Sequence, residues 1–585
     1  MAAPVTAQQE FPSPSIVDSR RLMGPNLYSV RAGAVIEVTC DDAHAQSLID
    51  TWSAQSIALA HALGWGEAET HARRETGGAT LFLAAPVDVL MTATEVNEQA
   101  WLIAESASPA EARDAIVGRL RATAEAERFR RPHLAAVFEE SRARGLSITC
   151  DDAWLTIGSG AGSLSWPLGD VPALRDVPWA TVRDVPIALV TGSNGKTTTT
   201  RLVAAMWRTA GVMPGWSCSD GVWAGDEQLE SGDFSGPGGA RCVLRASGIG
   251  AAVLETARGG ILRRGLAVSR ADAAIITNIS ADHFGEYGIT SVHDLAEVKG
   301  VVARVLDGAG RLVLNADDAL LVELAARVTA NVSWFSVSPA HPALDAHVRA
   351  GGDAATVHEG RAILHRDGAR YDLGDVTAMP ITLRGAAPHN VANILGAALL
   401  GSALGIPVAA IRATLAIFGA SAEDNPGRLQ VYRFGGVTVL VDYAHNPDGL
   451  AALCETAKAM PSQRRLLLLG QAGNRDDEQI RALVRAAWSV LSFDRVIVKE
   501  EIALLRGRVA GDVPGILVNE LARLGVPAQD VDVAPSELAA MQRAFEWAQD
   551  GDLLVCPIHI DKQDVLAWLG RLTDAGWRAG SDVPA

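Results

Sequence analysis

Short blocks of hydrophobic residues alternate with polar segments along most of this chain. Apolar runs of about five residues bounded by Gly, Pro or polar clusters predict buried strands, and apolar residues spaced three and four positions apart predict helices. Before residue 150, apolar runs at 34–38 and 80–85 and an Ala-rich helical stretch at 110–127 predict a small α+β domain, 16–150. Residues 1–15, rich in Ala, Gln, Ser and Pro, are expected to form a disordered tail.

After residue 186 the pattern changes to repeated strand–loop–helix units. Such alternation predicts α/β domains built on mostly parallel sheets. The Gly- and Pro-rich segment 151–185 has little periodicity and is expected to be a linker, and a second series of units begins near Asn425-Pro426-Gly427. Buried strands are expected at 187–191, 251–254, 273–277 and 312–314, and in the second series at 437–441, 465–469, 495–498 and 553–556.

Composition narrows the class of protein. The 585 residues suffice for several domains, and a formal net charge of -17 argues against a nucleic-acid partner, because such proteins concentrate positive charge. The 6 cysteines are scattered without a CxxC pair, which favours neither a zinc site nor a disulfide framework. We find neither an apolar run long enough to span a membrane nor an N-terminal export signal, so we expect a cytoplasmic protein with no membrane partner.

A glycine-containing loop follows the expected strand 187–191 and opens a helix. In Gly192-Ser193-Asn194-Gly195-Lys196-Thr197-Thr198, glycines let backbone N–H groups approach phosphate, Lys196 bridges the terminal phosphates, and the Thr197 hydroxyl can bind Mg²⁺. A glycine-rich helix start that only turns the chain is the competing interpretation. The flanking strand and helix favour phosphate binding. The first glycine lies closer to the lysine than in a generic GxxxxGK[ST] loop, which points away from ordinary NTPases.

This loop and several later motifs resemble the Mur ligase superfamily. Residues 191–199 resemble its phosphate loop, and residues 254–266, with Gly232-Asp233 and Ser235-Gly236-Pro237, resemble the Mur-like half of cyanophycin synthetase in particular. The resemblance covers about 186–560 and implies a central ATP-binding domain, 186–425, and a Rossmann-like C-terminal domain, 426–585.

The N-terminal part matches that family weakly. Residues 22–29 resemble the opening of cyanophycin synthetase, but the ATP-grasp domain that precedes the Mur-like half in that family has no room here. The uridine-nucleotide-binding first domain of the muramyl-peptide ligases is not recognisable, which argues against a cell-wall precursor as substrate.

A carboxylate and a histidine follow successive expected strands. Glu255 ends an apolar strand, where an α/β sheet presents side chains to ligands, and the resemblance implies that Glu255 and Thr197 hold one Mg²⁺. His283 matches a second metal ligand, and Lys299 matches a lysine that many Mur ligases carry as an N-carbamate. The competing interpretations are a solvated acid, a capping histidine and a surface ammonium.

Further residues match positions that hold nucleotide in the family. Asn315 and Asp317 resemble its adenine-contacting turn, and Arg428 matches an arginine that reaches the ATP phosphates. The alternatives are a helix cap for the first pair and a surface charge for Arg428. Asp442, in the last domain's signature, is expected to touch nucleotide after domain closure. His389, Asn390 and Asn393 resemble a nucleotide-holding pattern, although Gly385 stands further from the histidine than that pattern asks, which leaves helix capping open.

The resemblance also implies a substrate side. Candidate contacts to acceptor or amine, each with an ordinary polar loop as the alternative, are Arg258, Arg263, His445, Asn446, Arg475, Asp476 and Arg506.

Together these features predict an ATP-dependent ligase that activates a carboxylate as an acyl phosphate and couples it to an amino acid amine, releasing ADP and phosphate. Lys196, Glu255, His283 and Lys299 are the expected catalytic residues, with ATP and Mg²⁺ as cofactors. A polyglutamate-type ligase, an inactive nucleotide-binding scaffold and a bare P-loop ATPase or kinase are the rivals. The cyanophycin-like loops suggest an Asp or short-peptide acceptor and a basic amino acid. Two further partners stay open: a second copy of the chain and a separate ATP-grasp ligase.

Overall fold

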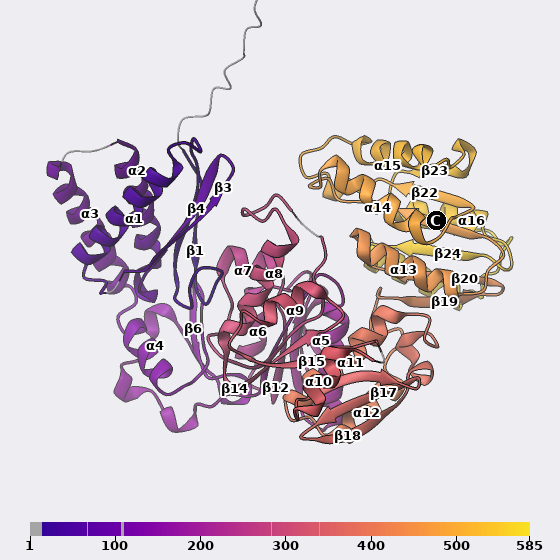
Figure 1. Cartoon of the computed structure of the whole chain (residues 1–585), viewed down its shortest axis with the longest axis horizontal. Helices are drawn as coiled ribbons and strands as arrows, with labels where there is room; N and C mark the ends of the chain where they lie inside the picture. The colour runs from indigo at the N-terminus through magenta and orange to yellow at the C-terminus, as the bar shows by residue number, and fades with distance from the viewer. Residues whose placement is uncertain (1–14, 67, 107–109, 282–283, 339, 585) are drawn as a thin grey trace, which may run out of the picture.

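The computed structural model describes residues 15–66, 68–106, 110–281, 284–338 and 340–584. Of the expected tail, residues 1–15, only Ser15 is among the described residues. His283 lies outside them. Figure 1 shows the N-terminal body in indigo, a large central body in magenta and red, and the C-terminal body in yellow on the far side of the centre. Among the described residues, no helix combines the length and the apolar character needed to cross a bilayer.

The N-terminal body is an antiparallel sheet covered on one face by helices, as the sequence predicts. The strand order is β1-β2-β4-β3, and Trp52 and Trp101 from the helices are fully buried against the sheet. The elements are β1 Ser15–Leu22, β2 Gly33–Thr39, α1 Ala45–Ala62, β3 Thr70–Glu75, β4 Gly78–Ala84, α2 Leu90–Ser106 and α3 Ala110–Phe129.

Residues 151–185 differ from the expected bare linker. They join β5 in a three-stranded sheet, β5-β6-β7, that packs with α4 around a buried cluster including Leu155 and Ile157. The Gly and Pro residues hid this structure, because each strand is too short to show a period. The elements are α4 Leu134–Ala143, β5 Ile148–Cys150, β6 Trp154–Ile157 and β7 Leu164–Pro167.

The central body is built on an 11-stranded sheet with the order β11-β10-β9-β12-β8-β13-β14-β15-β16-β17-β18. The adjacent strands β9, β12, β8, β13, β14, β15 and β16 are parallel, as predicted, and antiparallel strands extend both edges. The strands are β8 Ile187–Thr191, β9 Pro214–Cys218, β10 Gly221–Ala224, β11 Glu227–Ser231, β12 Ala251–Glu255, β13 Ala271–Ile276, β14 Leu306–Asn315, β15 Asn331–Ser336, β16 Ala354–His358, β17 Arg361–Arg366 and β18 Ala369–Asp375.

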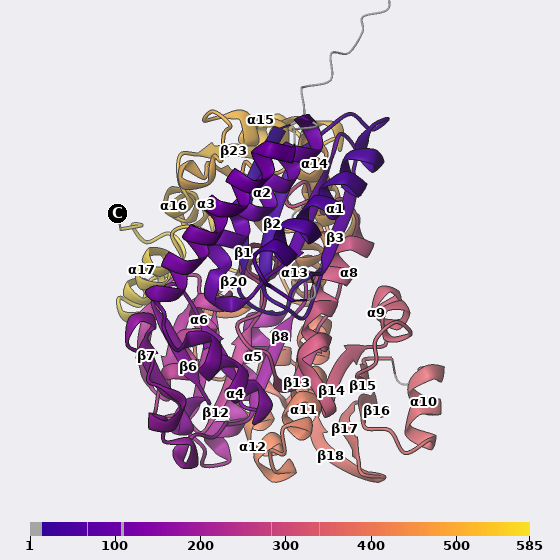
Figure 2. The same cartoon turned by 90° about the vertical axis from the view of Figure 1, so that its left-hand side faces the viewer.

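Helices cover both faces of this central sheet, which explains its continuous apolar strands. Ala188 and Val190 of β8 face the cluster under α5, α11 and α12, whereas Leu189 faces the cluster under α6 to α9. Figure 2 shows α8 and α9 beside the parallel strands. The helices are α5 Lys196–Thr209, α6 Pro237–Arg245, α7 Arg258–Arg264, α8 Val292–Gly300, α9 Ala319–Ala325, α10 Pro342–Arg349, α11 Pro388–Ala403 and α12 Val408–Ile417.

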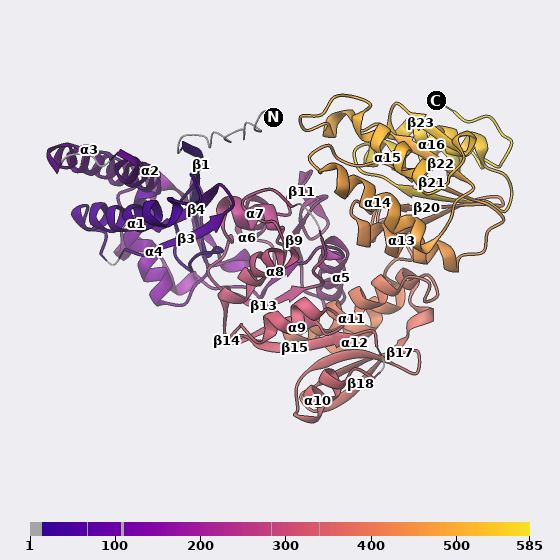
Figure 3. The same ribbon diagram turned by 45° about the horizontal axis from the view of Figure 1, so that its top comes forward.

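The C-terminal body is a second doubly covered sheet, with the order β19-β20-β24-β21-β22-β23. Within the described residues β19 pairs antiparallel with β20, and the other neighbouring strands of this sheet are parallel. Figure 3 shows α13, α14 and α15 beside the strands of this body. The four expected strands match β20, β21, β22 and β24. The elements are β19 Gln430–Phe434, β20 Val437–Asp442, α13 Pro447–Ala459, β21 Arg465–Leu469, α14 Asp477–Val490, β22 Arg495–Lys499, α15 Asp512–Arg523, β23 Val531–Ala534, α16 Glu537–Trp547, β24 Leu553–Pro557 and α17 Lys562–Asp574.

An aromatic cluster holds one face of the C-terminal sheet. The Phe545 ring meets Trp568 edge-on at 4.9 Å and Trp577 at 4.8 Å between centroids. We expect Phe545→Ala to lower the free energy of unfolding of this body by about 3–5 kcal/mol, because it removes buried contacts and leaves a cavity. Denaturant unfolding followed by tryptophan fluorescence measures this. Val533→Ala, at a side chain 46% exposed, is the control, and equal losses for both variants would contradict the expectation.

Candidate active site between the central and C-terminal bodies

The loop after β8 has the backbone geometry of a phosphate cradle. Gly192 has φ +144° and Gly195 has φ +85°, a region that side chains rarely allow. A Cβ at Gly192 would lie 1.9 Å from Thr277 Oγ1, and one at Gly195 would lie 2.2 Å from Asn393 Oδ1. Thr277 Oγ1 also donates to the Asn194 carbonyl at 2.6 Å, which fixes the loop against the next strand. Only glycine fits both positions. The amides of Ser193 and Asn194 each donate to Asn278 at 2.9 Å, so a phosphate would be bound by the amides that open α5.

Lys196 and Thr197 open α5 directly behind the loop. The Lys196 ammonium donates to the Ser193 carbonyl at 3.0 Å and thus lies over the loop. Thr197 Oγ1 donates to Glu255 Oε2 at 2.8 Å, and Ser219 Oγ lies 3.0 Å from the Thr197 hydroxyl. Three oxygen donors from α5, β12 and the turn after β9 therefore converge. Such a hard oxygen set suits Mg²⁺, which usually takes its remaining ligands from water and phosphate.

Glu255 is not a solvated acid. Its side chain is 2% exposed at the end of β12. Burial raises the pKa of Glu255, and the charges of Lys196 and Arg428 oppose that rise. A buried carboxylate beside oxygen donors gains strongly from a cation, which is consistent with metal binding.

Lys299 is also buried, so the surface-ammonium interpretation is wrong. It lies near the end of α8, is 4% exposed, and its ammonium donates to the Gly192 carbonyl at 2.8 Å. Lys299 therefore fixes the position of the first glycine of the phosphate loop. Its carbamylation stays a prediction, as does the metal role of His283.

Arg428 connects the two bodies. Its Nη2 donates to Ser219 Oγ at 2.8 Å, and its guanidinium lies 4.2 Å from the centroid of the Tyr443 ring. Burial alone would lower the pKa of Arg428, but the nearby carboxylates, Asp220 first, raise it overall. The arginine is thus a fixed cation beside Thr197 rather than a surface charge.

Several residues that were expected to contact nucleotide make hydrogen bonds within the fold. Asp317 accepts hydrogen bonds from Ser336 Oγ at 2.7 Å and from the Val337 amide at 2.8 Å. Asn390 donates to the Ile381 carbonyl at 2.9 Å and accepts from Asn393 at 3.0 Å. These bonds position the turn and the start of α11, so direct nucleotide contact by these side chains remains a prediction.

Asn315 and His389 lie close by. Asn315 Oδ1 accepts from the amide of Asp317 at 3.0 Å, so it caps its own turn. Burial lowers the pKa of His389, which favours the neutral ring. Within the described part of the chain, its Nδ1 has no hydrogen-bond partner.

The C-terminal body contacts the phosphate loop through an amide pair. Asn446 Nδ2 donates to Asn194 Oδ1 at 3.0 Å, and Asn194 Nδ2 lies 3.3 Å from Asn446 Oδ1. Asn446 also caps α13. Asp442 accepts the Leu429 amide at 2.7 Å, which fixes the chain between the bodies.

Arginines line the far side of the site. Arg258 pairs with Glu286 at 2.5 Å, and Arg263 donates to the Tyr287 hydroxyl at 2.8 Å. Arg475 is 6% exposed, and Arg506 adopts φ +48°, an uncommon conformation for a residue with a side chain.

A single cavity of about 1370 Å³ joins these parts. It is lined by both bodies, including Lys196, Glu255, Lys299, Arg428 and His445. Of the remaining predicted residues, Ser193, Asn194, Gly195, Thr197, Thr198, Asn315, Asp317, His389, Asn390, Asn393, Asp442, Arg258, Arg263, Arg475 and Arg506 also line it, whereas Gly192, Asn446 and Asp476 do not. Asp476 instead caps α14 through the Gln479 amide at 2.8 Å.

Sequence reasoning missed several lining residues. Ser219, Tyr443, Glu286, Glu501 and His559 all face the cavity. Tyr443 directly follows Asp442 in a recognised motif, so the motif could have identified Tyr443 as a site residue. The other four stand in no local pattern that predicts a ligand.

Known protein families match both α/β bodies of the chain. Models of the Mur ligase middle domain and of the Mur ligase, glutamate ligase domain match residues 190–401 and 427–557. Cyanophycin synthetase from Synechocystis sp. is 38% identical over 378 residues, which is 65% of this chain and 43% of that protein. UDP-N-acetylmuramate–L-alanine ligase from Bordetella avium is 30% identical over 381 residues, 63% of this chain and 73% of that protein.

The chain belongs to the Mur ligase family. It spans less than half the length of the cyanophycin synthetases that it matches. A solved structure of E. coli FolC in complex with ADP aligns with a TM-score of 0.46 at 17% identity, over 67% of this chain and 89% of that one.

Proposed function

We propose that this protein is an ATP-dependent ligase that forms an amide bond between a carboxylate and the amine of an amino acid. The observation that carries the proposal is the single cavity in which the phosphate loop, the oxygen donors around Glu255 and the C-terminal arginines meet. A simple ATPase has no need of a second body that closes over its phosphate loop. A ligase has that need, because an acyl phosphate must be kept from water until the amine arrives.

In the first step the acceptor carboxylate attacks the γ-phosphorus of ATP. An O–P bond forms, the bond to ADP breaks, and charge develops on the transferred oxygens. Lys196 and the amides that open α5 hold these oxygens, and the guanidinium of Arg428 adds positive charge. Mg²⁺, bound by Thr197 and Glu255, would neutralise further phosphate charge.

In the second step the amine attacks the acyl carbon. A C–N bond forms, the C–O bond to phosphate breaks, and the proton that the amine loses passes to the departing phosphate. The cavity walls formed by the C-terminal body orient the amine. We propose that Lys299 acts as a carbamate in this reaction. The resemblance to the Mur ligases supports this, and a carbamate nitrogen keeps one N–H that can still donate to the Gly192 carbonyl.

The loops that resemble cyanophycin synthetase suggest an Asp or short-peptide acceptor and a basic amino acid as the amine. A polyglutamate-type reaction is the alternative, and it shares the same chemistry.

A phosphate-release screen tests the proposal. The purified full chain, ATP and Mg²⁺ are mixed with amino acids paired with aspartyl peptides, glutamyl peptides or a folate, and products are read by mass spectrometry. We expect one ADP and one phosphate per amide formed. Release of AMP, or ATP hydrolysis unaffected by every amine and acceptor, would refute the ligase.

A further inference from the structure

An ion pair crosses from the C-terminal body to the central body, beside the chain segment that joins them. Lys562, the first residue of α17, donates from its ammonium to Asp220 Oδ1 at 2.6 Å. Asp220 lies in the turn between β9 and β10, and both side chains are only 15% exposed. Gly427, in the joining segment, packs against the lysine stem, because a Cβ there would lie 2.6 Å from Lys562 Cε. The pair therefore lies where a movement of one body against the other would be felt.

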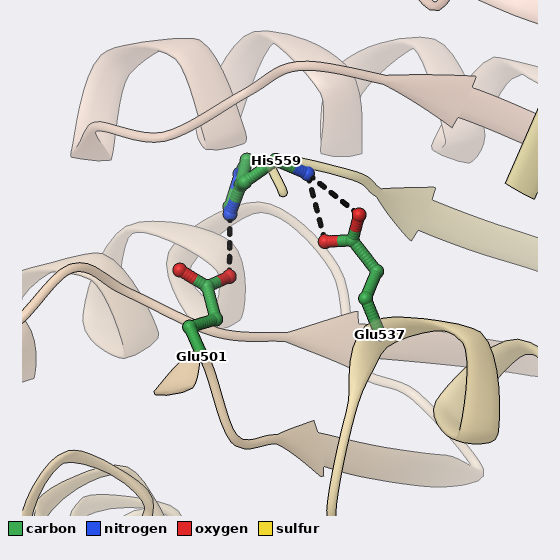
Figure 4. A group of neighbouring side chains, drawn as sticks. All are labelled: Glu501, Glu537 and His559. Atoms are coloured by element: carbon green, nitrogen blue, oxygen red, sulfur yellow. Dashed lines mark hydrogen bonds and ion pairs between the residues drawn. The ribbon is translucent and has the colours of Figure 1, made fainter. Parts of the chain in front are cut away.

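A buried cluster in the C-terminal body fixes the chain just before Lys562. Glu537 accepts the backbone amides of His559 at 2.7 Å and of Asp561 at 3.1 Å. The His559 ring in turn lies 2.7 Å from Glu501 Oε1 (Figure 4). Because Asp561 directly precedes Lys562, these bonds set where α17 begins relative to the sheet. The lysine is thus presented to the central body from a fixed position.

The central body fixes Asp220 beside the phosphate site. Arg201, on α5, donates from Nη2 to Asp220 Oδ2 at 3.3 Å. Ser219 directly precedes Asp220; its hydroxyl lies 3.0 Å from the Thr197 hydroxyl and accepts from Arg428 at 2.8 Å. A shift of the turn that carries Asp220 would therefore move Ser219 away from the oxygen donors around Thr197. The ion pair is connected to the reaction centre through a single peptide unit.

The charges favour the pair only while the two bodies are together. Burial alone would raise the pKa of Asp220, but Arg428, Lys562 and Arg201 lower it overall. Burial lowers the pKa of Lys562, and Asp220 opposes that fall. A buried charge is costly to leave unpaired, whereas both groups would be hydrated if the bodies separated. Each body also has its own apolar core, so neither core depends on the pair.

We propose that the Lys562–Asp220 pair holds the C-terminal body closed over the phosphate loop while the acyl phosphate exists, and that both are positioning residues for the turn at Ser219. The inference rests on the proposed ligase function. An acyl phosphate is kept only as long as water is excluded from it. One partly buried ion pair favours the closed arrangement and is still weak enough to break when product leaves.

Lys562→Met tests this inference, because it keeps most of the apolar stem and removes the charge. The full chain is given ATP, Mg²⁺, an aspartyl peptide and L-arginine, and phosphate release is compared with the amide formed. We expect the phosphate released per amide to rise about three- to tenfold, the change in population that the loss of one such pair produces. A body that opens more often lets water attack the acyl phosphate, which returns the carboxylate and phosphate without an amide. A loss of folded enzyme would lower both products together and leave their ratio unchanged.

Two further variants complete the set. Asp220→Asn should also raise the phosphate released per amide, and Asp220→Asn combined with Lys562→Met should raise it no further than the larger single change, because both act through one contact. Arg571→Gln is the matched control, since Arg571 is an exposed cation on the same helix, α17. We expect this control to behave as the wild type.

Small-angle X-ray scattering of the full chain with ADP and Mg²⁺ measures the arrangement of the bodies without turnover. We expect a larger radius of gyration for Lys562→Met and Asp220→Asn than for the wild type and Arg571→Gln. An unchanged radius in both folded variants overturns the inference, as does an unchanged ratio of phosphate to amide, and either result leaves the ligase standing. A wild type that forms no amide in the whole phosphate-release screen defeats the proposed function instead, and the scattering alone then decides whether the pair holds the bodies together.

Discussion

Lys196→Ala is expected to reduce amine-dependent release of ADP and phosphate by about 100- to 1000-fold, the range seen when one charge-stabilising donor is removed. The ammonium lies over the loop, 3.0 Å from the Ser193 carbonyl, where terminal phosphates would sit. Neither the glycine conformations nor the Thr197–Glu255 contact depends on it. The loss should therefore appear in kcat, measured by coupled ADP release, with the fold intact by circular dichroism.

Lys458→Ala is the matched control, because Lys458 is exposed near the end of α13, away from the cavity wall. We expect the control to retain full turnover. Substantial turnover in Lys196→Ala would remove the phosphate loop from the mechanism, and the proposal would fail with it.

Glu255→Gln is expected to raise the Mg²⁺ concentration needed for half-maximal activity by more than roughly tenfold and to lower kcat by about 100-fold. The amide oxygen can still accept from Thr197, so the local structure survives, but the charge that attracts the cation is gone. Because burial disfavours the ionised form of Glu255, the variant should not unfold more readily than the wild type. Turnover measured across an Mg²⁺ titration, after removal of metal with EDTA, checks both numbers.

Glu230→Gln on β11 is the control for that experiment, since its side chain is exposed. An unchanged Mg²⁺ requirement in Glu255→Gln would show that Glu255 serves the fold alone.

Local patterns predicted the parts of this molecule that local physics determines. Strand β8 and the loop after it could be predicted because a buried apolar run, glycines and a lysine all lie within ten residues. Strands β21 and β24 could be predicted from their buried apolar runs alone. The short strands β5 to β7 could not be predicted, because their stability comes from packing around Leu155 rather than from a period of their own.

The candidate site also contains residues that local patterns could predict and residues that they could not. Residues that lie inside motifs, such as Lys196 and Arg428, were found where the cavity is. Glu501 and Ser219 were missed, because each becomes meaningful only when chain segments far apart in sequence are brought together. Ser219 acquires its place from Thr197 and Arg428, which come from two different bodies. The burial of Lys299 likewise depends on tertiary packing, and a surface position was the reasonable expectation for a lone lysine.

The N-terminal sheet packs against α7 and α8. It can therefore influence the candidate active site without lining the cavity. The backbone amide of Met23 donates to the Arg264 carbonyl at 2.8 Å, and Arg20 donates to the Leu262 carbonyl at 3.1 Å, so carbonyls in the last turn of α7 are satisfied from outside. Arg73 clamps the start of α8 through Asp294. One helix begins with Arg258 and the other carries Lys299. The small domain therefore limits how far these two helices can move, and with them the side chains that they present to the cavity.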